Sequence, residues 1–344
     1  MAAQLPVLLP VCSKVSGSTY PGEKLVKYTL IALFGLLLAV SSANAADSKA
    51  AGGKGTEASK TLHWAGCGIT KKAFMKELAA EYERIYGVHF ELEGGGATKG
   101  IRRVKERSVE IGGSCRPKIS GAPEERFVRM TPVAWDALVV MVNKDNPVSN
   151  ISLRQVKELY EGKITNWKEL GGNDAPIELL VRKGKISGVG LTLRQLVWGN
   201  PDQEFKGTAE FPSSGPLEKA VVKNPNAIGI SGISSASKRD VKLLALEGKV
   251  PNYENIKSGH YLLYRPLYIT YMSRNNPQLK EIKRFISFAL SKRDREIIRA
   301  QGVVPYLDAI DLSSKLKEQR KTVRAMQEQR MTKKETNKKP GTEK

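Results

Sequence analysis

The chain has 344 residues, with 56 Lys and Arg against 35 Asp and Glu, which gives a formal net charge of +21. Its hydrophobic fraction of 40% is normal for a globular protein, and its length allows two domains of ordinary size. The one segment that approaches a membrane span, residues 28–40, is too short to cross a bilayer of about 30 Å as a helix, so no membrane-spanning helix is predicted.

This apolar segment has the flanks of a secretory signal peptide. Lys24 and Lys27 precede it, and the small residues of Ala43-Asn44-Ala45 follow it. We therefore predict that residues 1–45 are a signal peptide cleaved after Ala45. Residues 1–25 do not fit a signal sequence. We interpret them as a wrongly assigned start, with translation beginning at Leu25 or Val26; a genuine extension is the alternative.

Strands, glycine-containing loops and helices alternate after a small, polar, flexible leader at residues 46–60. We predict strands at residues 61–65 and 88–92, each followed by a glycine loop and a helix, and a short strand and turn at residues 109–117. This order is expected of a parallel sheet with ligand loops at the carboxyl ends of its strands.

The middle of the chain opens with the apolar run 137–142, which lacks polar side chains and predicts a buried strand. Ser152, with Gln155 three residues later, forms a capping box that opens a helix. The segment closes with the phrase GKITNW at residues 162–167.

The second half of the chain repeats the same order. Further strands are predicted at residues 177–182 and 264–271, loops at 183–190 and 211–215, and helices at 191–197, 217–222, 279–289 and 294–300.

The segment 132–172, with its GKITNW phrase, resembles the phosphate-binding (PstS-like) subunits of bacterial ABC phosphate importers. The phrases NPNAIGI, ENIKSGHYLLYRPLYI and QGVVPY are similar to that family too, so the resemblance covers roughly residues 62–306. It implies an α/β, two-lobed type II periplasmic binding-protein fold, each lobe a mostly parallel sheet flanked by helices, with the ligand cleft between the lobes. A generic α/β crossover is the alternative.

The resemblance also implies a domain organisation. Residues 61–142 plus 260–312 would form lobe 1, and residues 143–259 would form lobe 2. Residues 313–344 carry 11 Lys or Arg against four Asp or Glu, a net charge of +7, and predict a basic, mobile tail that is helical at most to Met326.

Four loops are expected to bind an oxyanion in this family, because helix N-termini, hydroxyls and an arginine all offer donors to it. The matching residues are Cys67, Gly68, Ile69 and Thr70; Gly95, Gly96 and Ala97; Ser114 and Cys115; and Arg182 with Ser187, Gly188 and Val189.

The same loops depart from the family's pattern. Cys67 replaces a hydroxyl residue, Gly95 replaces a serine, Cys115 replaces an acceptor carboxylate, and Val189 replaces a threonine. Each lost donor weakens a charge-bearing bond by roughly 1–3 kcal/mol. Three interpretations therefore stay open: phosphate or a related tetrahedral oxyanion, a different small ligand, or a role outside transport.

The two cysteines of the mature chain would lie on neighbouring loops of that site. In an oxidising compartment, Cys67 and Cys115 either form a disulfide or lie on loops in contact. A thiol or metal site that adds His63 is the less favoured interpretation, because the three histidines lack metal spacing. We predict no metal ligands and no cofactor.

No catalytic motif and no phosphate-binding P-loop is present, so we predict a binding protein and not an enzyme. The expected protein is a periplasmic monomer of a Gram-negative bacterium that delivers its ligand to a membrane ABC permease. A sensor or interaction protein of the same fold, with an altered or lost ligand, is the alternative. Nucleic acid is not an expected partner, and the basic tail is expected to steer anions or to touch anionic lipid head groups.

Overall fold

The computed structural model describes residues 60–336. The predicted signal peptide, the predicted start and residues 46–59 of the leader lie outside the described residues, as do residues 337–344. None of the described helices is long and apolar enough to cross a membrane.

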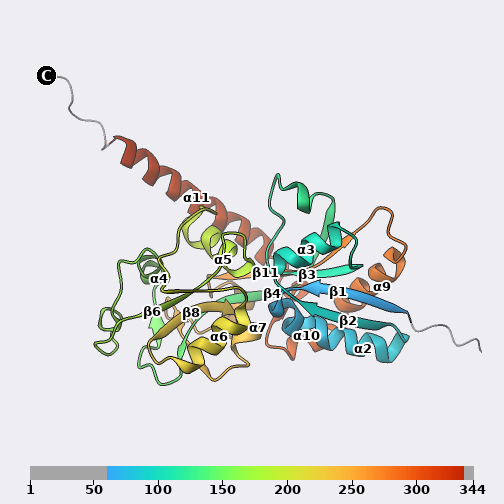
Figure 1. Ribbon diagram of the computed structural model, residues 1–344, viewed down its shortest axis with the longest axis horizontal. Helices are drawn as coiled ribbons and strands as arrows, with labels where there is room; N and C mark the ends of the chain where they lie inside the picture. The colour runs from blue at the N-terminus through green and yellow to red at the C-terminus, as the bar shows by residue number, and fades with distance from the viewer. Residues whose placement is uncertain (1–59, 337–344) are drawn as a thin grey trace, which may run out of the picture. The chain divides into compact units, whose positions relative to one another are not determined.

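Ten strands of the described residues form one sheet, whose main path runs through eight of them (Figure 1). In order along the path these are β2 (His89–Gly94), β1 (Thr61–Gly66), β3 (Ile111–Ser114), β11 (Tyr264–Met272), β4 (Val128–Asn143), β8 (Ala227–Gly232), β6 (Glu178–Arg182) and β7 (Ala209–Phe211). The other two strands of this sheet, β12 (Val304–Pro305) and β9 (Val241–Leu243), pair with β4. A separate two-stranded sheet is formed by β10 (Ala245–Leu246) and β5 (Asn150–Ile151).

The strands on either side of β11 and β4 are parallel to one another. β1 lies between β2 and β3 and is parallel to both, while β6 lies between β7 and β8 and is parallel to both. The two groups are joined through antiparallel pairs of β11 with β3 and of β4 with β8. The predicted parallel strand-loop-helix units are therefore present in both halves of the sheet.

Strand β4 belongs to both halves of the sheet. It pairs with β11 through residues 128–137 and with β8 through residues 138–142. All residues of the predicted strand 137–142 are buried, which confirms that prediction. The predicted lobe boundary after Val142 stays a prediction.

Helices cover the sheet and carry the buried apolar stripes that their spacing predicts. They are α1 (Gly68–Thr70), a π-helical turn (Lys71–Met75), α2 (Lys76–Tyr86), α3 (Ala97–Lys105), α4 (Leu153–Tyr160), α5 (Gly188–Leu193), a second π-helical turn (Arg194–Trp198), α6 (Ser214–Lys223), α7 (Ile233–Ala236), α8 (Tyr253–Ser258), α9 (Leu279–Leu290), α10 (Arg295–Arg299) and α11 (Leu312–Thr336). Short 3-10 turns lie at Pro123–Glu125, Trp167–Leu170 and Tyr306–Asp308. The capping box of Ser152 with Gln155 is present at the start of α4, as predicted.

The predicted tail is more ordered near its start than the sequence indicated. Residues 312–336 form one helix, which extends beyond Met326. Its first turns are docked, because Leu312 and Leu316 are buried and Gln319 donates from Nε2 to the Leu262 carbonyl at 2.9 Å. Docking depends on residues far away in the sequence, such as Leu262, and periodicity within residues 313–344 gave no sign of it. The mobility of the tail stays a prediction.

Deleting residues 313–344 is expected to destabilise the fold, whereas deleting residues 327–344 is not. The longer deletion removes buried Leu316, whose burial contributes about 1.5–3 kcal/mol. Thermal unfolding of both truncations beside the full chain checks this. Equal melting temperatures for the full chain and the chain that lacks residues 313–344 would contradict the docking of α11.

Candidate functional site

A cavity of about 600 Å³ lies where the carboxyl ends of β1, β3 and β6 meet the loops that follow them. Nine of the residues predicted to bind the ligand line it, and they come from all four predicted loops. They are Cys67, Gly68, Ile69, Gly95, Gly96, Ala97, Cys115, Arg182 and Gly188. The structure therefore brings the four loops together at one site, as open parallel sheets do at the carboxyl ends of their strands.

The first loop begins a continuous helical stretch at residues 68–86. Cys67 is its N-cap residue, and its Sγ accepts a hydrogen bond from the Thr70 N–H at 3.4 Å. The Cys67 N–H donates to the Gly113 carbonyl at 3.2 Å, which holds this loop against β3. Gly68 and Ile69 follow on the cavity wall, so the N-terminal turn of this stretch faces the cavity.

The second loop requires its glycines. Gly95 has φ of 150° and Gly96 has φ of 101° with ψ of 164°, a region that is open in practice only to glycine. This backbone path brings the chain from β2 into α3, and it places Gly94 to Ala97 on the cavity wall. The free N–H groups of the first turn of α3 are consequently at the cavity.

The fourth loop places a guanidinium on the cavity wall. Arg182 donates to the Phe211 carbonyl at 3.2 Å, to the Pro212 carbonyl at 2.7 Å and to Ser214 Oγ at 2.9 Å. Three of its five N–H groups are thus used to hold this loop, and two are left for another acceptor. Burial lowers the pKa of Arg182, whose ordinary value is high enough that the side chain stays charged.

Four predicted binding residues do not line the cavity. The Thr70 hydroxyl donates to the Cys67 carbonyl at 2.9 Å, and the Ser114 hydroxyl donates to the Arg116 carbonyl at 2.7 Å. Ser187 caps α5, where its Oγ accepts from the Gly190 N–H at 3.2 Å, and Val189 is buried. The sequence placed these residues in the right loops but not their side chains at the surface of the cavity, because their polar atoms are used within the loops.

Sequence reasoning missed residues that complete the wall. They are Lys72, Gly94, Ser213, Ser214, Gly215, Pro216, Lys219, Ser235 and Arg239. The run from Ser213 to Pro216 starts α6, and a loop before a helix was predicted there, which was the available signal. Lys72 and Arg239 carried no such signal, because charged residues of that kind are common on exposed helix faces.

The wall is basic. Lys72, Arg182, Lys219 and Arg239 line the cavity, and none of the described residues in its wall carries a carboxylate. One acid lies behind the wall: Glu218 is fully buried, 3.6 Å from Lys72 Nζ and 3.2 Å from Arg239 Nε. The cavity thus presents cations and helix N-termini with only partial internal compensation, which suits an anion.

A buried ion pair supports the floor of the site. Arg265 on β11 donates to Asp136 Oδ2 from Nε at 3.3 Å and from Nη2 at 3.0 Å. Its Nη1 donates to the carbonyls of Cys115 and Gly188, both at 3.0 Å. Arg265 therefore links the third loop to the fourth, and this role could not be seen in the sequence.

The loops of the two cysteines are in contact at the cavity, because the Cys67 N–H donates to the carbonyl of Gly113, two residues before Cys115. Both are buried free thiols, and both line the cavity. A disulfide between Cys67 and Cys115 stays a prediction. Within residues 60–336, no group of three or more His, Cys, Asp or Glu is arranged to hold a metal ion.

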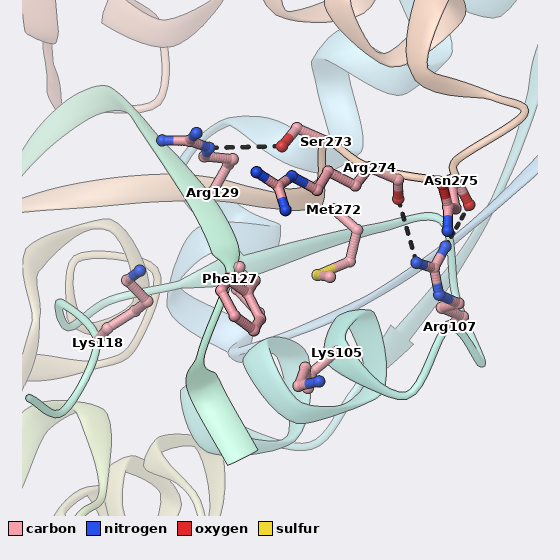
Figure 2. Close-up of a pocket in the computed structure, with 10 residues that line it drawn as sticks. Lys105, Arg107, Lys118, Phe127, Arg129, Met272, Ser273, Arg274 and Asn275 are labelled. Carbon is pink, nitrogen blue, oxygen red and sulfur yellow. Dashed lines mark hydrogen bonds between the residues drawn. The ribbon is translucent and has the colours of Figure 1, made fainter. Parts of the chain in front are cut away.

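A second basic cavity, of about 480 Å³, lies where β4 begins and β11 ends (Figure 2). Figure 2 shows Phe127 among basic side chains, with Arg107 donating to the carbonyls of Arg274 and Asn275. This cavity has no glycine loop and no helix N-terminus in its wall. Positive charge alone therefore does not identify the ligand site, whereas the combination of charge with helix N-termini favours the first cavity.

Comparison with known proteins agrees with this geometry. The family model described as the PBP superfamily domain matches residues 52–293. The phosphate-binding protein PstS of Bacillus subtilis is 28% identical over 294 residues, which are 83% of this chain and 95% of that protein. The protein of the same name from Pseudomonas aeruginosa is 26% identical over 66% of this chain and 77% of its own length.

Solved structures lead to the same fold. A phosphate ABC transporter substrate-binding protein of Clostridium perfringens, described as putative and solved with bound phosphate, has a TM-score of 0.65 and 28% identity, over 72% of this chain and 99% of its own. An ABC-type phosphate transport receptor from Vibrio cholerae has a TM-score of 0.56 and 28% identity, over 71% and 99%. The predicted α/β, two-lobed fold is confirmed, and the chain belongs to the PBP superfamily.

Proposed function

We propose that this chain is an exported solute-binding protein that captures phosphate or a related tetrahedral oxyanion and delivers it to an ABC permease. The observation that carries the proposal is the wall of the cavity, with four cationic side chains, the starts of α3 and α6, and no carboxylate. The names of the B. subtilis and P. aeruginosa relatives support phosphate as the ligand.

The anion would be held mainly by backbone N–H groups and by charge. The N-terminal turn of α3 offers N–H donors after Gly96, and the helix dipole favours a negative charge there. Arg182 has two N–H groups left for a bidentate contact, and Lys72 and Lys219 add charge from the cavity wall. Hydroxyl donors contribute less than the family pattern implies, because Thr70 and Ser187 bond within their own loops.

Phosphate and sulfate are both expected to bind, with dissociation constants that differ by less than about tenfold. A carboxylate in the wall would accept the proton of hydrogen phosphate and repel sulfate, and none lines this cavity. Isothermal titration calorimetry of the dialysed protein at pH 7.5 checks this, with chloride as the control anion. Absence of heat with both anions at millimolar concentration would contradict the proposal.

Three further properties belong to this proposal. Export to the periplasm through the predicted signal peptide fits a solute-binding protein. A membrane ABC permease is the proposed partner, and the protein itself is proposed to be a monomer without catalytic activity. Neighbouring genes for such a permease and its ATPase would support the partner.

A sensor or interaction protein of the same fold is the second candidate. The replacement of expected hydroxyl and carboxylate groups by Cys67 and Cys115 favours it, because thiols are weaker donors to an oxyanion. The calorimetric titration separates the two candidates, since only the first requires oxyanion binding.

A further inference from the structure

The floor of the proposed anion cavity contains two thiols on loops that are in contact. Cys67 follows β1 and Cys115 follows β3, and these strands are parallel neighbours in register at Gly66 and Gly113. The side chains are only 5% and 2% exposed, yet both line the cavity. The oxyanion function proposed above does not explain why two thiols lie where an anion would bind.

The surroundings of the two thiols differ. Cys67 Sγ accepts from the Thr70 N–H and lies 3.2 Å from Thr70 Oγ1, and burial raises the pKa of Cys67. The side chain of Cys67 and the charge of Arg265 lower the pKa of Cys115 to about 6, against the opposing effect of burial. These surroundings favour the thiol form of Cys67 and the thiolate form of Cys115.

Charged groups from three neighbouring strands act on Cys115. Arg265 on β11 and Arg182 on β6 stabilise its charge, whereas Asp136 on β4 opposes it. The thiolate is therefore an internal anion for Arg182, the guanidinium that would receive an oxyanion. A second anion entering the cavity meets repulsion from it, since like charges in a site of low dielectric interact strongly.

Close packing at the start of α5 fixes the position of Cys115. A Cβ added to Gly188 would come within 2.3 Å of Cys115 Sγ and 3.1 Å of Ala97 Cβ. Only glycine at position 188 leaves room for the sulfur between α3 and α5. The sulfur is therefore built into the junction of three of the four ligand loops.

We propose that Cys67 and Cys115 are a redox pair, and that their oxidation to a reversible disulfide converts the cavity from a low-affinity to a high-affinity state for oxyanions. The disulfide is neutral, so oxidation removes the internal anion and leaves the cations of the wall for the ligand. This inference rests on the proposed function.

The oxidation needs an external disulfide, R–S–S–R. The Cys115 thiolate attacks one of its sulfurs, forms a mixed disulfide and releases one RS⁻. Cys67 then loses its proton and attacks Cys115 Sγ, which forms the Cys67–Cys115 bond and releases the second RS⁻. The two protein sulfurs lose two electrons, which reduce the external disulfide to two thiolates. Because the charge of Arg265 stabilises the thiolate of the reduced form, the Cys67–Cys115 disulfide can be reduced again.

The test compares phosphate binding by reduced and oxidised protein. The full chain carrying Cys12→Ser is reduced with dithiothreitol or oxidised with bis(2-hydroxyethyl) disulfide, and small reagents are then removed. Intact mass is expected to show the loss of two hydrogen atoms on oxidation, and a thiol assay is expected to fall from two thiols to none. Calorimetry at pH 7.5 with inorganic phosphate is expected to give at least tenfold tighter binding for the oxidised form.

Two variants separate charge from cross-linking. Cys115→Ser removes the thiolate without a disulfide and is expected to bind as tightly as the oxidised parent, with or without reductant. Cys67→Ser cannot form the disulfide. After the oxidant and any mixed disulfide on Cys115 have been removed, this variant is expected to bind phosphate as weakly as the reduced parent.

Each result decides a stated part of the proposal. Equal affinity of the reduced and oxidised parent overturns the affinity change, and two thiols that survive oxidation overturn the redox pair. If no form binds phosphate or sulfate, the proposed function fails and the affinity change fails with it. The mass and thiol measurements still decide the disulfide in that case.

Discussion

Glu125→Gln is expected to lower the free energy of unfolding by about 3–5 kcal/mol, because it leaves a buried guanidinium without its counter-charge. Arg116 and Glu125 are both fully buried, and Arg116 donates to the two carboxylate oxygens at 2.9 and 2.5 Å. The Ile119 N–H adds a third bond to the carboxylate at 2.8 Å. A glutamine keeps the shape of the side chain, so the lost free energy of unfolding is due to the removed charge.

The measurement is urea unfolding at pH 7, with Glu124→Gln as the matched control. Glu124 is the exposed neighbour, and its loss of charge is expected to change stability by less than about 0.5 kcal/mol. The double variant Arg116→Met with Glu125→Leu removes both charges and is expected to recover most of the loss. A Glu125→Gln protein within about 1 kcal/mol of the parent would show that the pair is not buried in solution.

The Arg116–Glu125 pair also makes the free energy of unfolding depend on pH. Burial alone would raise the pKa of Glu125, but the bonds from Arg116 and the Ile119 N–H outweigh it and hold the pKa below its ordinary value. A carboxyl whose pKa is lowered by folding stabilises the protein above its unfolded pKa of about 4.3, and that stability is lost as the pH falls below it. Glu125→Gln is therefore expected to lose less stability than the parent between pH 5 and pH 3.

Local signals in the sequence were sufficient for much of the fold. The Ser152 and Gln155 capping box fixes the start of α4 through bonds only three residues apart, so no distant residue has to be known. The run 137–142 is buried on both faces, and a short polar-free run is typical of a strand that is covered on both sides. Strand and helix order followed from such signals.

Elements that depend on distant partners were found less completely. Strand β4 begins at Val128, well before the apolar run, because its first part is completed by β11 across a register shift at Leu267 and Tyr268. The start of helix α11 is docked, because Leu316 is buried and Gln319 bonds to the Leu262 carbonyl, and the sequence gave no sign of this docking. Neither partner could be assigned from a single window of sequence.

The site shows the same division. The sequence located all four loops, since glycine and helix starts are local features. The sequence did not place the side chains correctly, because the Thr70 hydroxyl points to the Cys67 carbonyl, which accepts its hydrogen bond, and not into the cavity. The basic wall was missed because Lys72 and Arg239 become functional candidates only when Glu218 and the cavity are placed beside them.

Arg182→Ala is expected to weaken phosphate binding by about 2–4 kcal/mol, the cost of removing one partner from a buried, hydrogen-bonded charge pair. This corresponds to a dissociation constant raised by roughly 30- to 700-fold. Arg182 is the predicted site residue whose guanidinium lies on the cavity wall, and its bonds to the Phe211 and Pro212 carbonyls hold its direction. Arg182→Lys keeps the charge but loses the paired N–H donors of the guanidinium, so its affinity for phosphate is expected to lie between those of the parent and Arg182→Ala.

Calorimetry with phosphate on the oxidised protein is the measurement, and Arg154→Ala is the control. Arg154 lies on α4, its side chain is 75% exposed, and its ion pair with Glu158 contributes little, so removing it changes net charge equally without touching the cavity. Ser214→Ala removes the bond from Arg182 Nη1 and a hydroxyl of the cavity wall, and it tests how much the loop contacts of Arg182 contribute. If Arg182→Ala binds phosphate as Arg154→Ala does, the anion is not held by this guanidinium, and the N-terminal turns of α3 and α6 with Lys72 and Lys219 must hold it alone.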